Sequence, residues 1–346
     1  MEKSFTHNSI DKIEGLKYVD SNITGFSRIK KGKGFSFIDQ KKKTITDSKT
    51  LSRIASLVIP PNWEKVWICP DKTGHLQATG YDIKGRKQYI YHPKWNALRK
   101  EDKFAMLLPF AKGLNGLKKQ IRKDLRRKEI DLQKVSALAL QIMDLTSMRA
   151  GNQFYEKENG SFGLTTLKNR HLSIDKNKIT FKYIGKKGVP QEKKLTAKKL
   201  AQILKKVRSI PGQQLFQFED QHKKIHQLDS GHLNEYLFQV YQQHITCKTF
   251  RTWNACYLCL KQFLNLKYAE DPKIRKQQVQ ETIKTVAKQL GNSKSVALKH
   301  YIHPQLINDY ESGTLGNWIR KNKDRSDSEK DKRIQVRLIK IIDTKQ

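Results

Sequence analysis

The hydrophobic pattern of this chain changes its period about a hundred residues in, and that change limits the folds open to it. Between Gly34 and His92 the apolar residues form short runs separated by turn residues, which is typical of β-strands. From Lys103 onward they recur at spacings of three and four, as on one face of an α-helix. We therefore predict an α+β chain with a small β-rich N-terminal domain, residues 1–98, and a larger, mostly α-helical domain, residues 99–346.

One segment of the helical part returns to strand-like alternation. Residues 179–184 alternate, and Gly185-Lys186-Lys187-Gly188 follows as a tight turn. This turn would close a hairpin with the segment before Leu195 and expose Lys186 at its tip. Further helices are predicted at about 196–208, 231–243, 249–266 and 273–290. The charged tail after Trp318 is predicted to be solvated, although residues 334–342 could add a short packed element.

Two helix ends carry residues of chemical interest. Gly151 is placed to end a helix that would hold Arg149 at its C-terminal end. Leu290-Gly291-Asn292 would likewise close a later helix, so the phenol of Tyr301 can stand free at a helix junction.

The charge of the chain points to a polyanionic partner. The sequence holds 69 Lys and Arg against 33 Asp and Glu, a formal net charge of +36. Nucleic acid is the first candidate for such a folded polycation. An anionic membrane surface is the alternative, but no apolar run approaches the roughly 18 residues that a span needs, and the N-terminus lacks the apolar stretch of a secretory signal. We expect double-stranded DNA as the partner, no membrane contact and an intracellular location.

Neither the cysteines nor the histidines suggest a metal site. Cys256 and Cys259 form a C-x-x-C pair in an apolar helical stretch, without a second pair, so buried structural thiols are the favoured interpretation. The histidine pairs 222 with 226 and 300 with 303 lack an evident third ligand. The sequence also lacks a Gly-rich Lys-Ser/Thr phosphate loop. We therefore expect no metal and no cofactor.

Arg149, Lys186, Arg251 and Tyr301 could converge on a phosphodiester from separate elements. In-line displacement at phosphorus builds negative charge on the equatorial oxygens, which forked guanidinium donors stabilise. A phenol beside such cations is an adequate nucleophile, and a lysine can protonate a departing 5′-hydroxyl. Taken singly, each residue has an ordinary structural explanation, such as a core tyrosine or a helix-end arginine. Taken together, they predict cleavage of a phosphodiester through a tyrosine.

Several sequence motifs resemble those of a known protein family in their order and spacing. They are Met148-Arg149-Ala150-Gly151-Asn152 with Tyr155, Gly163 to His171, Phe181 to Gly188, Lys248 to Trp253, Leu290-Gly291-Asn292 and His300 to Pro304, preceded in the N-terminal third by Pro60 to Pro70, Gly74 to Gly80 and Gly85 to His92. Over almost its whole length the chain resembles type IB DNA topoisomerases of the bacterial and poxvirus branch. The resemblance implies a two-domain clamp around duplex DNA that relaxes supercoils by transient cleavage of one strand, without ATP or Mg²⁺.

The resemblance also implies roles for individual residues. Tyr301 would form a 3′-phosphotyrosyl link, Arg149 and Arg251 would hold the scissile phosphate, and Lys186 would act as general acid. Asn292 would donate a hydrogen bond to a nonbridging oxygen, in a place where poxvirus enzymes carry histidine. Thr249, where the family often has Asp, and Ala150, where a larger aliphatic residue is common, depart from the pattern. Loss of the acid could loosen how Arg251 is oriented.

The same comparison yields DNA-contact candidates, namely Lys87, Gln88, Tyr89, Tyr91, Tyr155, Lys168 and Arg170. Lys87 and Gln88 suit phosphate or base-edge contacts, whereas alternate positions on a strand could equally face a core. We expect a monomer in the bacterial cytoplasm. A tyrosine recombinase is the nearest alternative, but its second motif usually reads His-x-x-Arg where this chain has Lys248-Thr249-Phe250-Arg251. A non-catalytic basic DNA-packaging protein is the alternative from another class.

Overall fold

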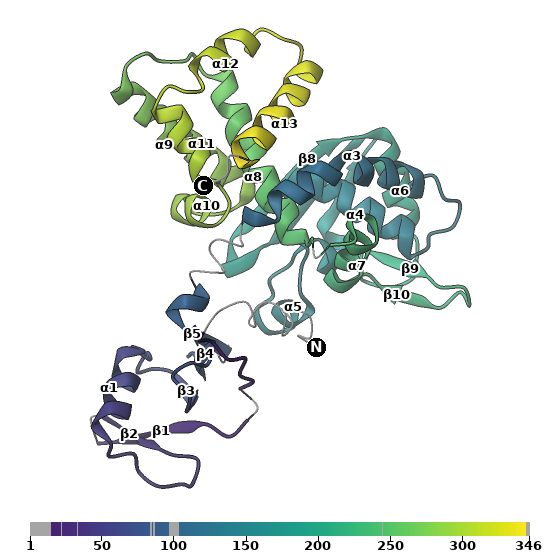
Figure 1. Cartoon of the computed structure of the whole chain (residues 1–346). Helices are drawn as coiled ribbons and strands as arrows, with labels where there is room; N and C mark the ends of the chain where they lie inside the picture. Colours follow the sequence, from purple (N-terminus) through teal and green to yellow (C-terminus); the bar gives the residue numbers. More distant parts are fainter. Residues whose placement is uncertain are drawn as a thin grey trace. The chain divides into compact units, whose positions relative to one another are not determined.

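The chain divides into two compact units, residues 1–102 and 103–346 (Figure 1). The computed structural model describes residues 15–96 and 104–343, except 22, 33, 84, 86 and 244. The predicted domain boundary, between residues 98 and 99, lies outside the described residues. The α+β prediction is confirmed, because the first unit is built on a sheet and the second is mostly helical.

The N-terminal unit is an antiparallel five-stranded sheet. Its strands are β1 (Phe26–Lys31), β2 (Gly34–Ile38), β3 (Glu64–Ile68), β4 (Leu76–Tyr81) and β5 (Lys87–Tyr91), in the order β2-β1-β3-β4-β5. In this sheet, residues 78–80 of β4 pair with residues 88–90 of β5. A helix that the sequence analysis did not predict, α1 (Ser48–Ser56), begins after Asp47, whose carboxylate accepts from the Thr50 N–H. Its Ile54 is buried in a cluster with residues of β3 and β4.

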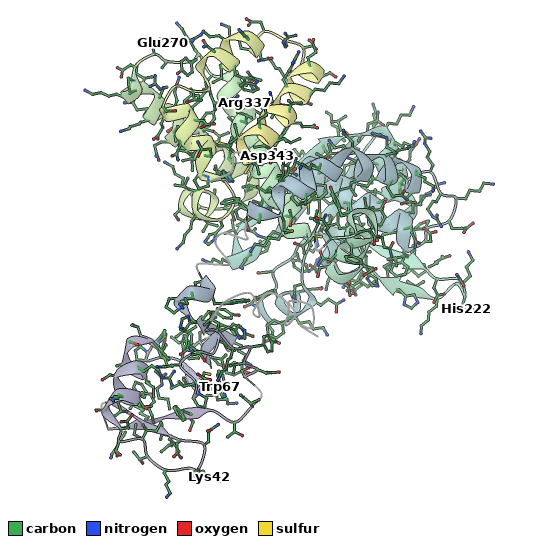
Figure 2. All side chains as sticks on the ribbon, viewed as in Figure 1. Lys42, Trp67, His222, Glu270, Arg337 and Asp343 are labelled. Atoms are coloured by element: carbon green, nitrogen blue, oxygen red, sulfur yellow. The ribbon has the colours of Figure 1, made fainter. Side chains whose placement is uncertain are left out.

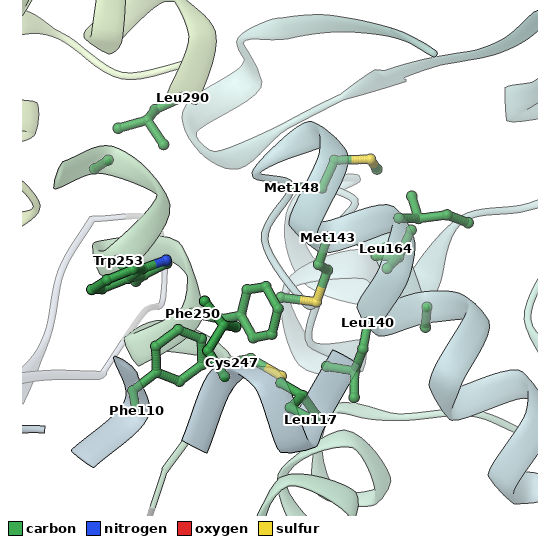
Figure 3. Close-up of a cluster of buried hydrophobic side chains, with 14 of the residues drawn as sticks. Phe110, Leu117, Leu140, Met143, Met148, Leu164, Cys247, Phe250, Trp253 and Leu290 are labelled. Carbon is green, nitrogen blue, oxygen red and sulfur yellow. The ribbon is translucent and has the colours of Figure 1, made fainter. Parts of the chain in front are cut away.

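The core of the larger unit is a group of packed helices. They are α3 (Leu107–Asp124), α4 (Leu132–Thr146), α7 (Ser230–Tyr241) and α8 (Cys247–Asn265). Figure 3 shows Phe110, Met143 and Phe250, from three of these helices, in one buried cluster. The Phe110 and Phe250 rings meet edge to face, with centroids 5.1 Å apart. This core fixes the start of α8, which carries Arg251.

Smaller elements surround this core. They are α5 (Gln153–Asn159), β6 (Leu172–Asp175), β7 (Lys178–Ile184), β8 (Pro190–Thr196), α6 (Lys198–Arg208), β9 (Gln217–Glu219) and β10 (Ile225–Gln227). β6, β7 and β8 form an antiparallel sheet in sequence order. β7 and β8 are the predicted hairpin, and Lys186 lies at its tip in a short 3-10 turn. The predicted helices at about 196–208 and 231–243 are therefore confirmed as α6 and α7, to within two residues.

The C-terminal helices gather at one end of the larger unit (Figure 1). They are α9 (Pro272–Leu290), α10 (Lys294–His300), α11 (Pro304–Glu311), α12 (Gly316–Asn322) and α13 (Asp327–Asp343). As predicted, the charged residues 323–329 are exposed and residues from 334 onward pack, because α13 buries Ile334, Leu338 and Ile341, although at 17 residues it is longer than the short element expected. Asp331 of α13 accepts hydrogen bonds from Tyr257 and Lys261 of α8. This helix therefore braces α8.

The surface agrees with the composition. Nitrogen-tipped side chains extend outward from both units (Figure 2), as a net charge of +36 requires. Within the described residues, no helix is long and apolar enough to cross a membrane, and no group of three or more His, Cys, Asp or Glu side chains could hold a metal ion. All four cysteines are free and buried.

Candidate active site

Arg251 is the buried centre of the site. It lies in the second turn of α8 and is only 4% exposed. Its guanidinium donates hydrogen bonds to the carbonyl oxygens of Ser147, after α4, and of Leu290, at the end of α9. Burial, with the charge of Arg149, lowers the pKa of Arg251 to about 10. Three helices thus meet at one guanidinium, and the two carbonyls orient it although Thr249 replaces the acid common in the family.

Asn292 and Arg149 form a second pair beside it. The guanidinium of Arg149 donates to the side-chain oxygen of Asn292. Asn292 is placed by the end of α9, where Gly291 adopts the left-handed conformation at φ 62° and the Asn292 N–H returns to the Ala287 carbonyl at 2.9 Å. This orientation leaves the Asn292 amide nitrogen, like the ε-nitrogen of Arg251, buried without a hydrogen-bond acceptor in the described part of the chain.

Two donors without acceptors in one site are chemically informative. Buried N–H groups are nearly always satisfied in folded proteins, because leaving one unpaired costs about 1–3 kcal/mol. Here the two groups belong to side chains that already hold other partners, and two arginines add positive charge beside them. An oxyanion would satisfy both donors. The arrangement therefore suits a phosphate.

The backbone of Arg149 is fixed by two glycines. The helix α4 ends at Thr146 and not, as predicted, at Gly151, because Ser147 adopts the left-handed conformation at φ 53°. The following loop is held where the Leu164 N–H donates to the Arg149 carbonyl at 2.8 Å. A Cβ at Gly163 would lie 2.5 Å from the Gly151 Cα and 2.9 Å from the Arg149 oxygen. Only glycine allows this approach.

We expect Gly163→Ala to lower both the free energy of unfolding and the cleavage rate. The new methyl group would meet backbone atoms, which cannot swing away, so overpacking should cost about 1–3 kcal/mol. Displacing Arg149 by about 1 Å should slow cleavage by about 100-fold. Urea unfolding and single-turnover DNA cleavage would measure the two effects.

Gly116→Ala is the matched control. Gly116 is exposed on α3 with nothing within 4 Å of an added Cβ, so this change should stabilise the protein by about 0.5–1 kcal/mol and leave cleavage unaltered. Equal stabilities of the two variants would contradict the role given to the Gly151–Gly163 contact.

Tyr301 completes the cluster. It lies at the C-terminal end of α10, and its ring centroid is 5.2 Å from the Arg251 guanidinium carbon. The backbone around it is held by Cys256 of α8, whose thiol donates to the Tyr301 carbonyl at 3.2 Å and accepts from the His303 N–H at 3.3 Å. Burial opposes ionisation of the phenol, but the charges of Arg251, Arg149 and Lys248 outweigh it and lower the pKa of Tyr301. The lowered pKa favours the nucleophilic phenolate.

Tyr183 shows that the net effect of the arginines on the pKa of a phenol depends on its position. The same two arginines act on its phenol, yet burial dominates there and raises the pKa of Tyr183 to about 12. Tyr183 is 8% exposed on β7, and its side chain belongs to the core. Of these two tyrosines, only in Tyr301 do the cations outweigh burial.

We expect Tyr301 to titrate below the ordinary tyrosine pKa of about 10. Subtracting the ultraviolet tyrosinate titration of Tyr301→Phe from that of the wild type isolates this phenol. Lys248→Gln should raise the midpoint, because one of the cations that lowers it is removed. In the window between the folded and unfolded pKa values the unfolded state binds more protons, so Tyr301 should contribute stability that rises with pH. A midpoint above about 10 would contradict this account.

Lys186 is not hydrogen-bonded to the other four residues in the described structure. It is exposed at the hairpin tip, where its ammonium lies 5.9 Å from the ring centroid of Tyr155 on α5. Tyr155 is itself 45% exposed. The structure therefore brings together Arg149, Arg251, Asn292 and Tyr301, and presents Lys186 from a separate, solvent-facing turn.

The predicted DNA-contact residues occupy varied settings. Lys168 pairs with Glu156 at 3.4 Å, and Arg170 is exposed nearby. On β5, the rings of Tyr89 and Tyr91 stack with centroids 6.0 Å apart, and Tyr89 is 41% exposed.

Lys87 and Gln88 already have partners within the N-terminal unit. The Lys87 ammonium donates to the Ser21 hydroxyl at 3.0 Å. The Gln88 amide donates to Asp82 at 3.0 Å, and Gln88 alternates with Tyr89 along the strand, on the same side as the core residue Ile90. The side-chain types favoured Gln88 over Tyr89 as a DNA contact. The geometry favours Tyr89 over Gln88 as a surface contact.

Sequence reasoning missed two lysines that affect the site. Lys248 is exposed in the first turn of α8, and its charge contributes to the lowered pKa of Tyr301. Lys193, on β8, has a pKa lowered to about 8 by burial and by the charges of Arg251 and Arg149. The alternation of β8 contains a signal for it, because Lys193 shares a strand face with Leu195.

Comparisons with known proteins identify the family of the chain. A family model described as eukaryotic DNA topoisomerase I, catalytic core, matches residues 92–328, and one described as bacterial DNA topoisomerase IB, N-terminal domain, matches residues 34–82. DNA topoisomerase 1B of Acanthamoeba polyphaga mimivirus is 29% identical over 297 residues, which cover 84% of this chain and 88% of that protein. DNA topoisomerase 1B of vaccinia virus (strain Copenhagen) is 26% identical over 251 residues, covering 71% and 75%.

Among solved structures, the XerH site-specific recombinase bound to a palindromic difH substrate overlaps with a TM-score of 0.37 at 14% identity, covering 58% of this chain and 51% of that one. That overlap carries no functional argument. The catalytic-core match spans more than half of the chain, so the chain belongs to the DNA topoisomerase I family. Within that family its N-terminal match and its relatives make it a topoisomerase of type IB, which confirms the resemblance found in the sequence.

Proposed function

We propose that the chain relaxes supercoiled duplex DNA by cutting and resealing one strand through Tyr301. The observation that carries the proposal is the convergence of Arg149 and Arg251 on the Tyr301 phenol, with Asn292 bonded to Arg149 and two buried donors left for an anion. Arg149 and Arg251 would hold the scissile phosphate, and the free amide N–H of Asn292 would bind a nonbridging oxygen. Such preorganised donors are typically the largest single source of catalysis at a developing negative charge.

The proposed reaction has two balanced steps. The Tyr301 oxygen, having lost its proton to solvent, forms a bond to phosphorus while the bond from phosphorus to the 5′-oxygen breaks. Lys186 gives that 5′-oxygen a proton, so cleavage leaves a 3′-phosphotyrosine and a free 5′-hydroxyl. Rotation about the intact strand releases supercoil strain. The 5′-hydroxyl then attacks the phosphotyrosine and returns its proton to Lys186, while the bond from phosphorus to the Tyr301 oxygen breaks and releases the phenolate. This restores the phosphodiester, so that the bond energy is conserved.

Relaxation of supercoiled plasmid in EDTA, without ATP, tests the proposal. We expect relaxed products and a protein covalently attached to a 3′ DNA end. The donors, acceptors and nucleophile of the reaction all belong to the chain itself. Neither ATP nor a metal ion should therefore be needed. Tight, salt-sensitive DNA binding without relaxation or adduct would instead support the non-catalytic DNA-binding alternative.

DNA contacts by the surface residues belong to the same proposal. Tyr89, Tyr91, Tyr155, Lys168 and Arg170 are proposed to contact duplex DNA, with Lys87 and Gln88 contributing if they exchange their present partners. Their support is exposure, charge and the N-terminal family match. We also propose that the enzyme acts as a monomer in a bacterial cytoplasm; the bacterial N-terminal match supports the location only. Sedimentation of the DNA-bound protein would test the monomer proposal, which predicts one chain per site.

A further inference from the structure

Lys193 occupies an unusual place for a lysine. In the register of the hairpin, Lys193 pairs with Phe181 and Gln191 pairs with Tyr183. Directly paired residues of an antiparallel ladder share a face, and both Phe181 and Tyr183 are buried. Burial along β8 alternates accordingly, with Lys193 half-buried and its neighbours exposed. The ammonium of Lys193 is thus directed to the inner face of the hairpin.

The ammonium of Lys193 binds the end of α9. It donates a hydrogen bond to the carbonyl of Gln289, directly before Leu290, whose carbonyl binds Arg251. The side chain of Gln191 touches the same turn, because a Cβ at Gly291 would lie 2.1 Å from its side-chain oxygen. Both inward polar residues of β8 therefore contact the turn that presents Asn292.

The packing around Lys193 explains why a hydrogen bond between β8 and α9 would matter. A cavity of about 1030 Å³ is lined by Ser147, Lys193 and Gln289, among others, so β8 and α9 are not in continuous contact there. Close packing, which normally fixes the relative position of two elements, is interrupted. Burial, followed by the charges of Arg251 and Arg149, lowers the pKa of Lys193 to about 8, which agrees with an ammonium held near both arginines.

We propose that Lys193 is a positioning residue that fastens the β7–β8 hairpin to the C-terminal turn of α9 and so holds Lys186 at a fixed spacing from Asn292 and the two arginines. The inference rests on the proposed role of Lys186 as general acid. It assigns Lys193 no contact with the DNA. Lys193 affects how often Lys186, the proton donor, is in place when the 5′-oxygen departs.

Lys193→Met tests this most directly, because it keeps the length of the side chain and removes both the donor and the charge. The neighbouring Lys194→Met is the matched control. Lys194 is exposed on the outer face of β8 and pairs with Glu192 at 3.2 Å. Single-turnover cleavage would be measured for both variants on one duplex, synthesised with either oxygen or sulfur at the bridging 5′ position. A thiol is a much stronger acid than an alcohol, with a pKa of about 8.5, so the sulfur leaves without a proton.

We expect Lys193→Met to cleave the oxygen duplex about 10- to 100-fold more slowly than the wild type, and the sulfur duplex at nearly the wild-type rate. Lys193→Arg, which keeps a charged donor, should recover part of the loss. Lys194→Met should match the wild type on both duplexes. The sulfur duplex also controls for folding, because a misfolded protein would fail on both substrates.

Two results would overturn the inference. Lys193→Met could cleave the oxygen duplex at the wild-type rate, or it could be slowed equally on both duplexes, which would assign Lys193 to phosphate binding or to stability. Lys186→Ala, measured in parallel, separates this failure from that of the proposed function. If Lys186→Ala is rescued by sulfur while Lys193→Met is not, only the role of Lys193 is wrong. If sulfur fails to rescue Lys186→Ala, the general-acid assignment is wrong and the inference falls with it.

Discussion

Tyr301→Phe should abolish plasmid relaxation, with a loss of at least about 10⁴-fold, and should leave no covalent protein–DNA adduct. The change removes one oxygen atom, which is the proposed nucleophile, and keeps the ring beside Arg251. DNA binding should persist because the cations that hold the phosphate remain. Stability should fall by only about 1 kcal/mol, because the phenol loses its one hydrogen bond with the Arg251 side chain. Relaxation assays and denaturing gels of end-labelled DNA would measure both outcomes.

Tyr183→Phe is the control for this substitution. Tyr183 lies within the influence of the same two arginines, but burial raises the pKa of its phenol to about 12, so it is a poor nucleophile. This variant should still form the adduct. An adduct that persists in Tyr301→Phe, or one mapped by peptide sequencing to Tyr183, would contradict the assignment of the nucleophile.

Arg251→Lys should slow cleavage by about 100- to 1,000-fold although it preserves the charge. The guanidinium bonds the Ser147 and Leu290 carbonyls at once and presents its ε-nitrogen as a further donor. An ammonium is a single point and cannot reproduce that planar fork. At least one buried carbonyl would lose its partner, so we expect a loss of about 1–3 kcal/mol in the free energy of unfolding. Single-turnover cleavage and urea unfolding would report the two effects.

Arg275→Lys separates the chemical effect from the structural one. Arg275 is similarly buried, at 7% exposure, and also bonds backbone carbonyls, those of Ala269, Glu270 and Glu311. It lies at the opposite end of α9 from Gly291. Its replacement should cost comparable stability and leave the cleavage rate of the folded protein unchanged. If both lysine variants slow cleavage alike, the effect of Arg251→Lys would be one of folding.

The sequence predicted those parts of the fold that depend on local pattern. The β7–β8 hairpin follows from alternation and a glycine-bounded turn, and the helices 249–266 and 273–290 follow from a period near 3.6, matching α8 and α9 within two residues. The end of α4 was misplaced because Ser147, not Gly151, adopts the left-handed conformation. A serine at positive φ is uncommon, and the loop that enforces it is held by contacts from residues 163–165, which local patterns do not encode.

The candidate site likewise contains residues that the sequence predicted and partners that it did not. Arg149, Arg251, Asn292 and Tyr301 were predicted from motifs, and the structure brings their side chains together. Their buried partners were not predicted, because the carbonyls of Ser147 and Leu290 are backbone groups that no side-chain motif reveals. Lys193 was missed because a lysine in a charged strand is usually solvated, and only the register with Phe181 shows which face it takes. For α13, the sequence indicated only that residues 334–342 could add a short packed element, because the apolar positions of this helix are spaced among charges that hide its full length.

The sulfur of Cys256 gives the site a mechanical property. Arg251 and Cys256 lie on one helix, five residues apart, and the thiol holds the backbone on both sides of Ile302, next to Tyr301. In the proposed covalent intermediate the 3′ end stays on the phosphotyrosine while the free 5′ end turns about the intact strand. The backbone of the nucleophile is bonded to α8, which is itself bonded to α13 and carries the guanidinium proposed to hold the phosphate. The held 3′ end and its phosphate-binding arginine would therefore share one helix as their support while the other end turns.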